Sequence, residues 1–239
     1  MKNAGKAKLE AVVIHSLVEE FEERGRVWLR NAVSNEDLTL FDRAAEVSEK
    51  PGQRLNPSVD LCAALSDESS LLSSVRCLAP AASPVRTVAF NKSARANWGV
   101  AWHQDRIIAV ANKRSVSGYV NWTNKHGTWH CEPPKSVLDE MLFVRVHLDD
   151  SDYSNGAMQI AVGSHAAGLV SSEKAHALAK HYPIEICEAR RGDVLVLKML
   201  TLHSSRSAKI QSGRRALRVD FSSQNLPPPL AWDWRSIKA

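Results

Sequence analysis

The segment GDVLVLKMLTLHSS, residues 192–205, carries the pattern that decides the fold. A Gly-Asp turn comes first, and the run Val194–Leu197 that follows it is apolar at every position. A short apolar run bounded by a turn is typical of a buried strand. The chain then reaches His203, which two serines follow. The segment therefore predicts a buried strand that leads to a candidate metal ligand.

Short runs of the same kind follow one another after residue 84, with turn signals such as Asn155-Gly156 between them. We predict further strands over Val85–Phe90, Ile107–Val110, Leu142–Leu148, Met158–Val162, Ile184–Cys187 and Ala216–Phe221. Helical patches are predicted only near 134–141 and 172–181. Because these strands do not alternate regularly with helices, they predict a sandwich or barrel. A double-stranded β-helix, the jelly roll of cupin-like proteins, is one such fold with room for a ligand.

The residues before this region have a helical pattern. Apolar residues recur at helical spacing over 9–22, and Gly25 is a plausible end of that helix. A short strand is predicted over 27–29, and a second helix begins where Ser34 resembles a capping residue. Residues 50–58 are predicted to be loop, and another helical patch is predicted over 59–78.

We therefore expect one domain over residues 1–239, mostly β with flanking helices. Residues 1–84 are its mainly helical support, 85–226 its jelly-roll core, and 227–239 a C-terminal tail that packs back through its tryptophans.

The composition is that of an ordinary globular protein, with 44% hydrophobic and 24% charged residues among 239. The sequence shows neither an apolar run of membrane-spanning length nor a signal core, so a cytoplasmic location is expected. The four cysteines are scattered and form no C-x-x-C pair, which predicts free thiols. The net charge of +5 comes from scattered residues. The scattering argues against a nucleic-acid groove, and an anionic small substrate explains the mild excess of positive charge equally well.

A candidate metal site is indicated by the segment Trp102-His103-Gln104-Asp105. Residues two apart on an extended chain point to the same side, so His103 and Asp105 can reach one ion. With His203 they would form a two-histidine, one-carboxylate set, which leaves adjacent positions on Fe(II) open for a bidentate cosubstrate and O₂. The alternative is two structural histidines and a surface carboxylate.

A candidate anion anchor is Arg214, which begins a predicted strand eleven residues after His203. A buried arginine is costly unless it meets an anion, and its fork matches a carboxylate. The distal carboxylate of 2-oxoglutarate would be such a partner. Arg215 and Arg218 are the alternative anchors, and Arg218 shares the face of Arg214.

Taken together, these motifs resemble the phytanoyl-CoA dioxygenase family of Fe(II)/2-oxoglutarate oxygenases. The resemblance rests on 102–105, 155–165, 192–194, 203–205 and Arg214, in that order, and on the opening segment 21–29. It implies His103, Asp105 and His203 as iron ligands and Arg214 as the cosubstrate anchor. Ser205 is expected to contact the cosubstrate, with a plain turn role as the alternative. The chain departs from the family at Arg145, where some relatives place an aromatic residue.

Substrate contacts are assigned to the stretch 111–135, a long polar and aromatic segment expected to form a lid loop. Within it, Trp129 and His130 are the candidate substrate-binding residues. Lys92 is expected to be exposed, with a position at the cavity mouth as the alternative.

The resulting hypothesis is a dioxygenase that hydroxylates a small organic molecule, with release of succinate and CO₂. Asp105 argues against halogenation, because halogenating relatives carry a small residue at that position. The alternative is a non-catalytic jelly-roll protein that binds a small molecule. We expect neither nucleic acid nor membrane as a partner.

Overall fold

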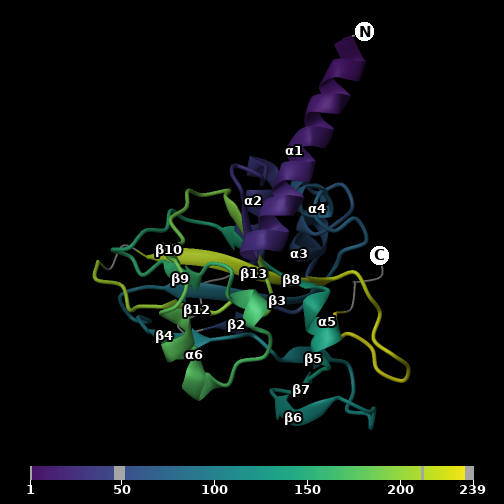
Figure 1. Cartoon of the computed structure of the whole chain (residues 1–239), viewed down its shortest axis with the longest axis vertical. Helices are drawn as coiled ribbons and strands as arrows, with labels where there is room; N and C mark the ends of the chain where they lie inside the picture. The colour runs from purple at the N-terminus through teal and green to yellow at the C-terminus, as the bar shows by residue number, and fades with distance from the viewer. Residues whose placement is uncertain (1, 46–51, 211–212, 235–239) are drawn as a thin grey trace.

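The computed structural model describes residues 2–45, 52–210 and 213–234. Two antiparallel sheets lie against each other, and the first four helices gather on the outer side of the larger sheet (Figure 1). The helices are α1 (Lys2–Arg24), α2 (Asn35–Ala44), α3 (Val59–Ala64), α4 (Ser70–Arg76), α5 (Lys135–Asp139), the 3-10 helix η1 (Ser164–Ala167) and α6 (Ser172–Ala179).

The larger sheet has six strands in the order β1-β11-β8-β13-β3-β2. Their bounds are β1 (Arg26–Leu29), β2 (Gln53–Arg54), β3 (Ser83–Lys92), β8 (Met141–His147), β11 (Val194–Lys198) and β13 (Arg214–Ser222). The smaller sheet has the order β10-β9-β12-β4, with β4 (Val100–His103), β9 (Met158–Ala161), β10 (Ile184–Ile186) and β12 (His203–Ser205). The two sheets form a jelly-roll core, as the strand pattern predicted. The core does not close into a barrel.

The larger sheet is covered on both faces, which explains why the run Val194–Leu197 of β11 is apolar at every position. Along β11, Val194 and Val196 pack against the helices, in a cluster with Phe41 and Leu61. The alternate residues of β11, Leu195 among them, pack between the sheets with residues of β9. Because side chains alternate along a strand, a strand covered on both faces needs apolar residues at every position.

The N-terminal helical portion is as predicted in outline. Helix α1 ends at Gly25, whose φ of 66° is in the left-handed region that favours glycine. Ser34 caps α2 by accepting a hydrogen bond from the Asp37 amide. The first half of α1 extends away from the body (Figure 1), and Val12 and Val13 are 58% and 52% exposed. The helical patch over 59–78 proves to be two helices, α3 and α4, and the loop 50–58 contains β2, with 50 and 51 outside the described residues.

The prediction of a lid loop over 111–135 is wrong. This stretch contains β6 (Val120–Lys125) and β7 (Thr128–Glu132), which form a third sheet with β5 (Ile108–Val110). The turn between β6 and β7 is His126-Gly127, and both residues have positive φ, 52° and 85°. Two positive φ values in a two-residue loop define the type I′ hairpin, whose twist suits the flanking strands.

Two further expectations are met within the described residues. All four cysteines are free thiols. Trp232 and Trp234 of the tail pack against the two main clusters. None of the described helices is long and apolar enough to cross a membrane.

Candidate metal centre

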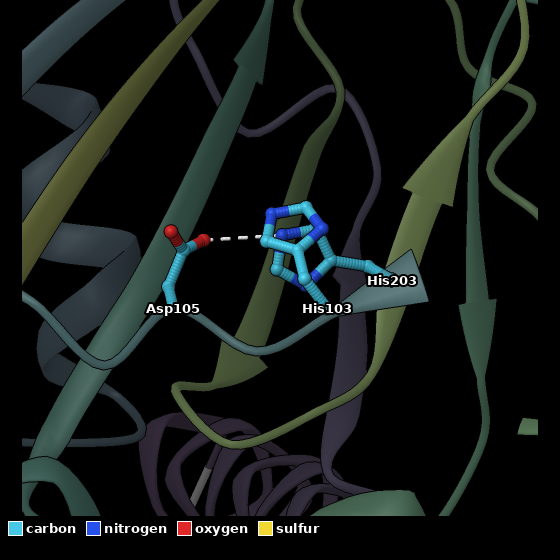
Figure 2. Close-up of side chains that lie close together, drawn as sticks. All are labelled: His103, Asp105 and His203. Carbon is cyan, nitrogen blue, oxygen red and sulfur yellow. Dashed lines mark ion pairs between the residues drawn. The ribbon is translucent and has the colours of Figure 1, made fainter. Parts of the chain in front are cut away.

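His103, Asp105 and His203 come together at one point between the sheets (Figure 2). His103 ends β4, and its direct partner across the smaller sheet is His203 at the start of β12. Asp105 lies two residues beyond β4 and turns toward the same point. One ligand atom from each residue lies within 4.8 Å of the others. This spacing suits a single metal ion.

The backbone orients both histidines for metal binding. Nδ1 of His103 lies 2.8 Å from the Ala101 carbonyl oxygen, and Nδ1 of His203 lies 2.9 Å from that of Thr201. A carbonyl only accepts, so each Nδ1 must carry the proton and donate it. Nε2 of each ring is then left with a free lone pair. Metal-binding histidines usually have this outer hydrogen bond, because it selects the tautomer and fixes the ring.

The contact between His203 and Asp105 supports a cation at this position. His203 Nε2 lies 3.1 Å from Asp105 Oδ2. A lone pair facing a carboxylate oxygen at that distance is repulsive unless a proton or a metal ion lies between them. Burial lowers the pKa of the neighbouring His103, and the nearby His203 lowers it further. The residues therefore fit a divalent metal, whose ligands must be unprotonated.

Asp105 is held in its ionised form by Arg218. Burial by itself would raise the pKa of this carboxyl, but Arg218 and His203 outweigh it and hold the pKa well below its usual range. Arg218 Nη1 donates to Asp105 Oδ2 at 2.5 Å. The same guanidinium also donates to the Asp220 carboxylate, from Nε at 2.6 Å and from Nη2 at 3.1 Å. Arg218 thus connects the candidate ligand to a second, fully buried carboxylate on its own strand.

Replacing Arg218 with methionine is expected to weaken metal affinity by about 10- to 100-fold, the usual cost of losing an outer-shell partner. The reason is that Asp105 loses both its orientation and the charge that keeps it ionised. Titration with Mn(II), followed by calorimetry, measures the effect. Arg215→Met is the matched control, because Arg215 pairs with Asp149 and Asp42 on the other face of β13. Equal metal affinity in the folded Arg218 variant and the control would contradict this role.

A cavity of about 250 Å³ opens beside the three ligands, and Arg214 lines it. The Arg214 side chain is buried, and its Nε and Nη1 have no hydrogen-bond partner. Arg218 also lines the cavity but is occupied by its two carboxylates. Arg215 faces away, toward α2. Of the three candidate anchors, Arg214 is thus the one with free donors in the cavity. Ser205 lines the cavity as well.

Two further cations, Lys92 and Arg145, line this cavity. The sequence favoured an exposed Lys92 over one at the cavity mouth, and it assigned no contact to Arg145. Lys92 was expected to be exposed, and this is wrong: its side chain is fully buried at the end of β3. Arg145 on β8 is buried too. The available signal was the alternation of each strand, which places both on the inner face of the larger sheet.

A second, larger cavity of about 660 Å³ meets the metal centre at Asp105 and Arg86. Its lining is basic and includes Arg54 and His130. Burial, together with the charges of Arg54 and Arg86, lowers the pKa of His130 to about 4. His130 is therefore neutral at pH 7. Trp129 was predicted with His130 as a substrate contact. It packs instead against the apolar cluster between the sheets that contains Leu195, and it lines neither cavity.

Comparison with known proteins places the chain in a family. The model of the phytanoyl-CoA dioxygenase (PhyH) family matches residues 1–216, and the chain belongs to this family. It is therefore an enzyme of the iron(II)- and 2-oxoglutarate-dependent oxygenase class, which uses iron(II), 2-oxoglutarate and O₂. No curated protein sequence matches the chain.

Several solved structures share the fold at low sequence identity. The 2-oxoglutarate-dependent carbocyclase SnoK of nogalamycin biosynthesis is 16% identical, with a TM-score of 0.62 over 87% of this chain and 83% of that one. The epimerase SnoN, solved with Fe³⁺ and α-ketoglutarate, is 14% identical, with a TM-score of 0.62 over 95% and 94%. HygX from Streptomyces hygroscopicus, solved with nickel and 2-oxoglutarate, is 17% identical, with a TM-score of 0.59 over 87% and 85%.

Proposed function

We propose that this protein hydroxylates a small organic molecule and couples the reaction to the conversion of 2-oxoglutarate into succinate and CO₂. His103, Asp105 and His203 hold the iron. Arg214 pairs with the distal carboxylate of 2-oxoglutarate, and Ser205 contributes a hydroxyl to the same ligand. One oxygen atom of O₂ enters the substrate as a hydroxyl group, and the other enters succinate.

The observation that carries the proposal is the meeting of two features in one cavity. The backbone contacts leave Nε2 of both histidines free for a metal, and Asp105 is held in its ionised form. Beside them lies a buried guanidinium with free N–H groups. A buried cation without a partner is costly, and a carboxylate is the ligand that its fork matches. A metal-chelating 2-oxo acid with a distal carboxylate satisfies both features.

The chain supplies orientation and the exclusion of water. Bound iron(II) supplies the redox chemistry that activates O₂. Three protein ligands on one side leave the other side open to the cosubstrate and O₂. Phe143 packs edge-on against the His203 ring, with centroids 5.4 Å apart, and so covers the ligand from the between-sheet core. Because the site lies between two apolar layers, the charges around it act in a low dielectric.

The substrate is proposed to enter through the larger cavity, with His130 on its wall. That cavity meets the metal site on the side of Asp105, away from Arg214, which lines only the smaller one. Trp129 remains a candidate substrate contact only because it lies on the same hairpin as His130. Because Asp105 occupies the carboxylate position, hydroxylation is preferred over halogenation. SnoK and SnoN are a carbocyclase and an epimerase, so the products must be identified directly.

Succinate formation tests the proposal against the alternative of a non-catalytic binding protein. The purified chain is expected to convert 2-oxoglutarate to succinate with Fe(II) and O₂, slowly alone and faster with a true substrate. Removing iron with a chelator should stop the reaction, and adding Fe(II) should restore it. Candidate small molecules are screened for stimulated succinate release. A protein that binds both iron and 2-oxoglutarate but never forms succinate would be the non-catalytic alternative.

A further inference from the structure

The inner face of the larger sheet carries more positive charge than one cosubstrate carboxylate requires. Across the β13–β3 ladder, Arg214 lies directly opposite Lys92. Across the β13–β8 ladder, Arg218 lies directly opposite Arg145. Like charges in directly opposite positions destabilise a sheet unless something neutralises them. All four side chains line the cavity at the metal centre.

Of these four cations, the protein neutralises only Arg218 with carboxylates of its own. Arg218 is paired with Asp105 and Asp220, and Arg86 with Asp220. Among the described residues, no carboxylate forms an ion pair with Lys92, Arg145 or Arg214. Their exposed fractions are 2%, 5% and 3%, so bulk solvent screens their charge only weakly.

The contacts that these three side chains do make leave their charge unneutralised. Lys92 Nζ donates to the carbonyl oxygens of Gly156 and Arg206. Arg145 stacks over Phe90 at 5.5 Å, and its Nε has no partner. The nearby Cys187 is not an anion, because burial raises the pKa of its thiol.

The lowered pKa of Lys92 reflects the electrostatic cost of placing these cations together. Burial, together with Arg214 and Arg145, lowers the pKa of Lys92 to about 7. Burial and Arg214 lower the pKa of Arg145 to about 9. A folded protein retains such a cluster at a cost, and a bound anion would remove that cost.

We propose that Lys92 and Arg145 act together with Arg214 as a three-cation receptor that selects 2-oxo acids by the negative charge of their distal group. The inference rests on the proposed position of the cosubstrate. The inference goes beyond that position, because one guanidinium would suffice to pair with one carboxylate and the cavity holds two further cations. The receptor suits a distal group with more than one negative charge better than it suits a single carboxylate.

Binding to the unmodified chain is the first test, with Mn(II) in place of iron so that no turnover occurs. Three 2-oxo acids of matched length are compared by calorimetry: 2-oxoglutarate, 2-oxo-4-phosphonobutyrate and 2-oxopentanoate. The phosphonate is expected to bind about tenfold tighter than 2-oxoglutarate at pH 7, where Lys92 still carries part of its charge. 2-Oxopentanoate, which has an uncharged methyl group at its distal end, is expected to bind at least a hundredfold more weakly. A phosphonate that binds no better than the carboxylate would overturn the proposal.

Two variants then assign the selectivity to residues. Lys92→Met and Arg145→Met are each expected to weaken 2-oxoglutarate binding about tenfold, the equivalent of one charged hydrogen bond. Neither should change the binding of 2-oxopentanoate, because the lost charge faces only the distal group. Arg145→Lys should recover most of the loss. Equal weakening of both ligands would mean a structural role and would overturn the assignment.

The melting temperature of the ligand-free protein separates a receptor role from a structural role, because the two roles predict opposite changes. Removing one of three buried, mutually repelling cations should raise the melting temperature in Arg145→Met. Arg215→Met, the matched control one residue from Arg214, should lower it, because Arg215 pairs with Asp149. A lower melting temperature in Arg145→Met would count against the receptor.

The failure of this inference is distinguishable from failure of the proposed function. If the unmodified chain binds Mn(II) but not 2-oxoglutarate, the proposed function is wrong. If it binds 2-oxoglutarate and Arg214→Met weakens binding while Lys92→Met and Arg145→Met do not, the function stands and the receptor is wrong. The ligand comparison on the unmodified chain decides the question even where a variant misfolds.

Discussion

His203→Ala and His103→Ala are each expected to abolish iron-dependent succinate formation. Each variant removes one of three protein ligands, and the loss should exceed the roughly 10- to 100-fold that outer-shell substitutions cost. The side chains meet with their ligand atoms within 4.8 Å, and no other described histidine, cysteine or carboxylate belongs to this group. The site therefore has no spare ligand to replace the lost imidazole.

The measurement pairs turnover with metal content. Purified variants are loaded anaerobically with Fe(II), and bound iron and succinate formation are both determined. His176→Ala is the matched control, because His176 is exposed on α6, far along the chain from the ligands, and alanine favours the helix. Near-normal turnover in either ligand variant would show that the iron is held elsewhere. Asp105→Ala is expected to behave like the histidine variants.

Arg214→Ala is expected to raise the KM for 2-oxoglutarate by at least about a hundredfold. Removing one partner of a buried charged pair costs about 3–5 kcal/mol, and about 1.4 kcal/mol corresponds to a factor of ten. The structure adds a second expectation. Because Nε and Nη1 of Arg214 have no partner in the protein, its loss should not destabilise the ligand-free chain.

Steady-state kinetics with 2-oxoglutarate varied at saturating Fe(II) measure the effect. Arg214→Lys should recover only part of the affinity, because one ammonium group cannot reproduce the two parallel hydrogen bonds of the fork. Arg215→Ala is the control and should leave KM almost unchanged, since Arg215 pairs with Asp149 and Asp42 on the opposite face. An unchanged KM in Arg214→Ala would move the anchor to another cation of the cavity.

Much of the fold was predictable because its signals are local. The buried strand over 194–197, the end of α1 at Gly25 and the cap at Ser34 each depend on a few adjacent residues. The metal ligands were predictable for a similar reason. His103 and Asp105 are close in sequence, and His203 follows a recognisable buried strand. The hairpin over 120–132 was missed because its His126-Gly127 turn lacks the usual Asn-Gly signal.

The sequence by itself determined most strands of the two main sheets, which side chains of each strand share a face, and which three residues can ligate a metal. Only the tertiary structure decided how these faces meet. The pairing of Arg218 with Asp105 joins residues 113 positions apart, and the buried Lys92 contacts the distant carbonyl oxygens of Gly156 and Arg206. A strand's period states which side chains point the same way, but not which strand lies beside it or what covers it. Charge partners therefore become visible only once the register between distant strands is known.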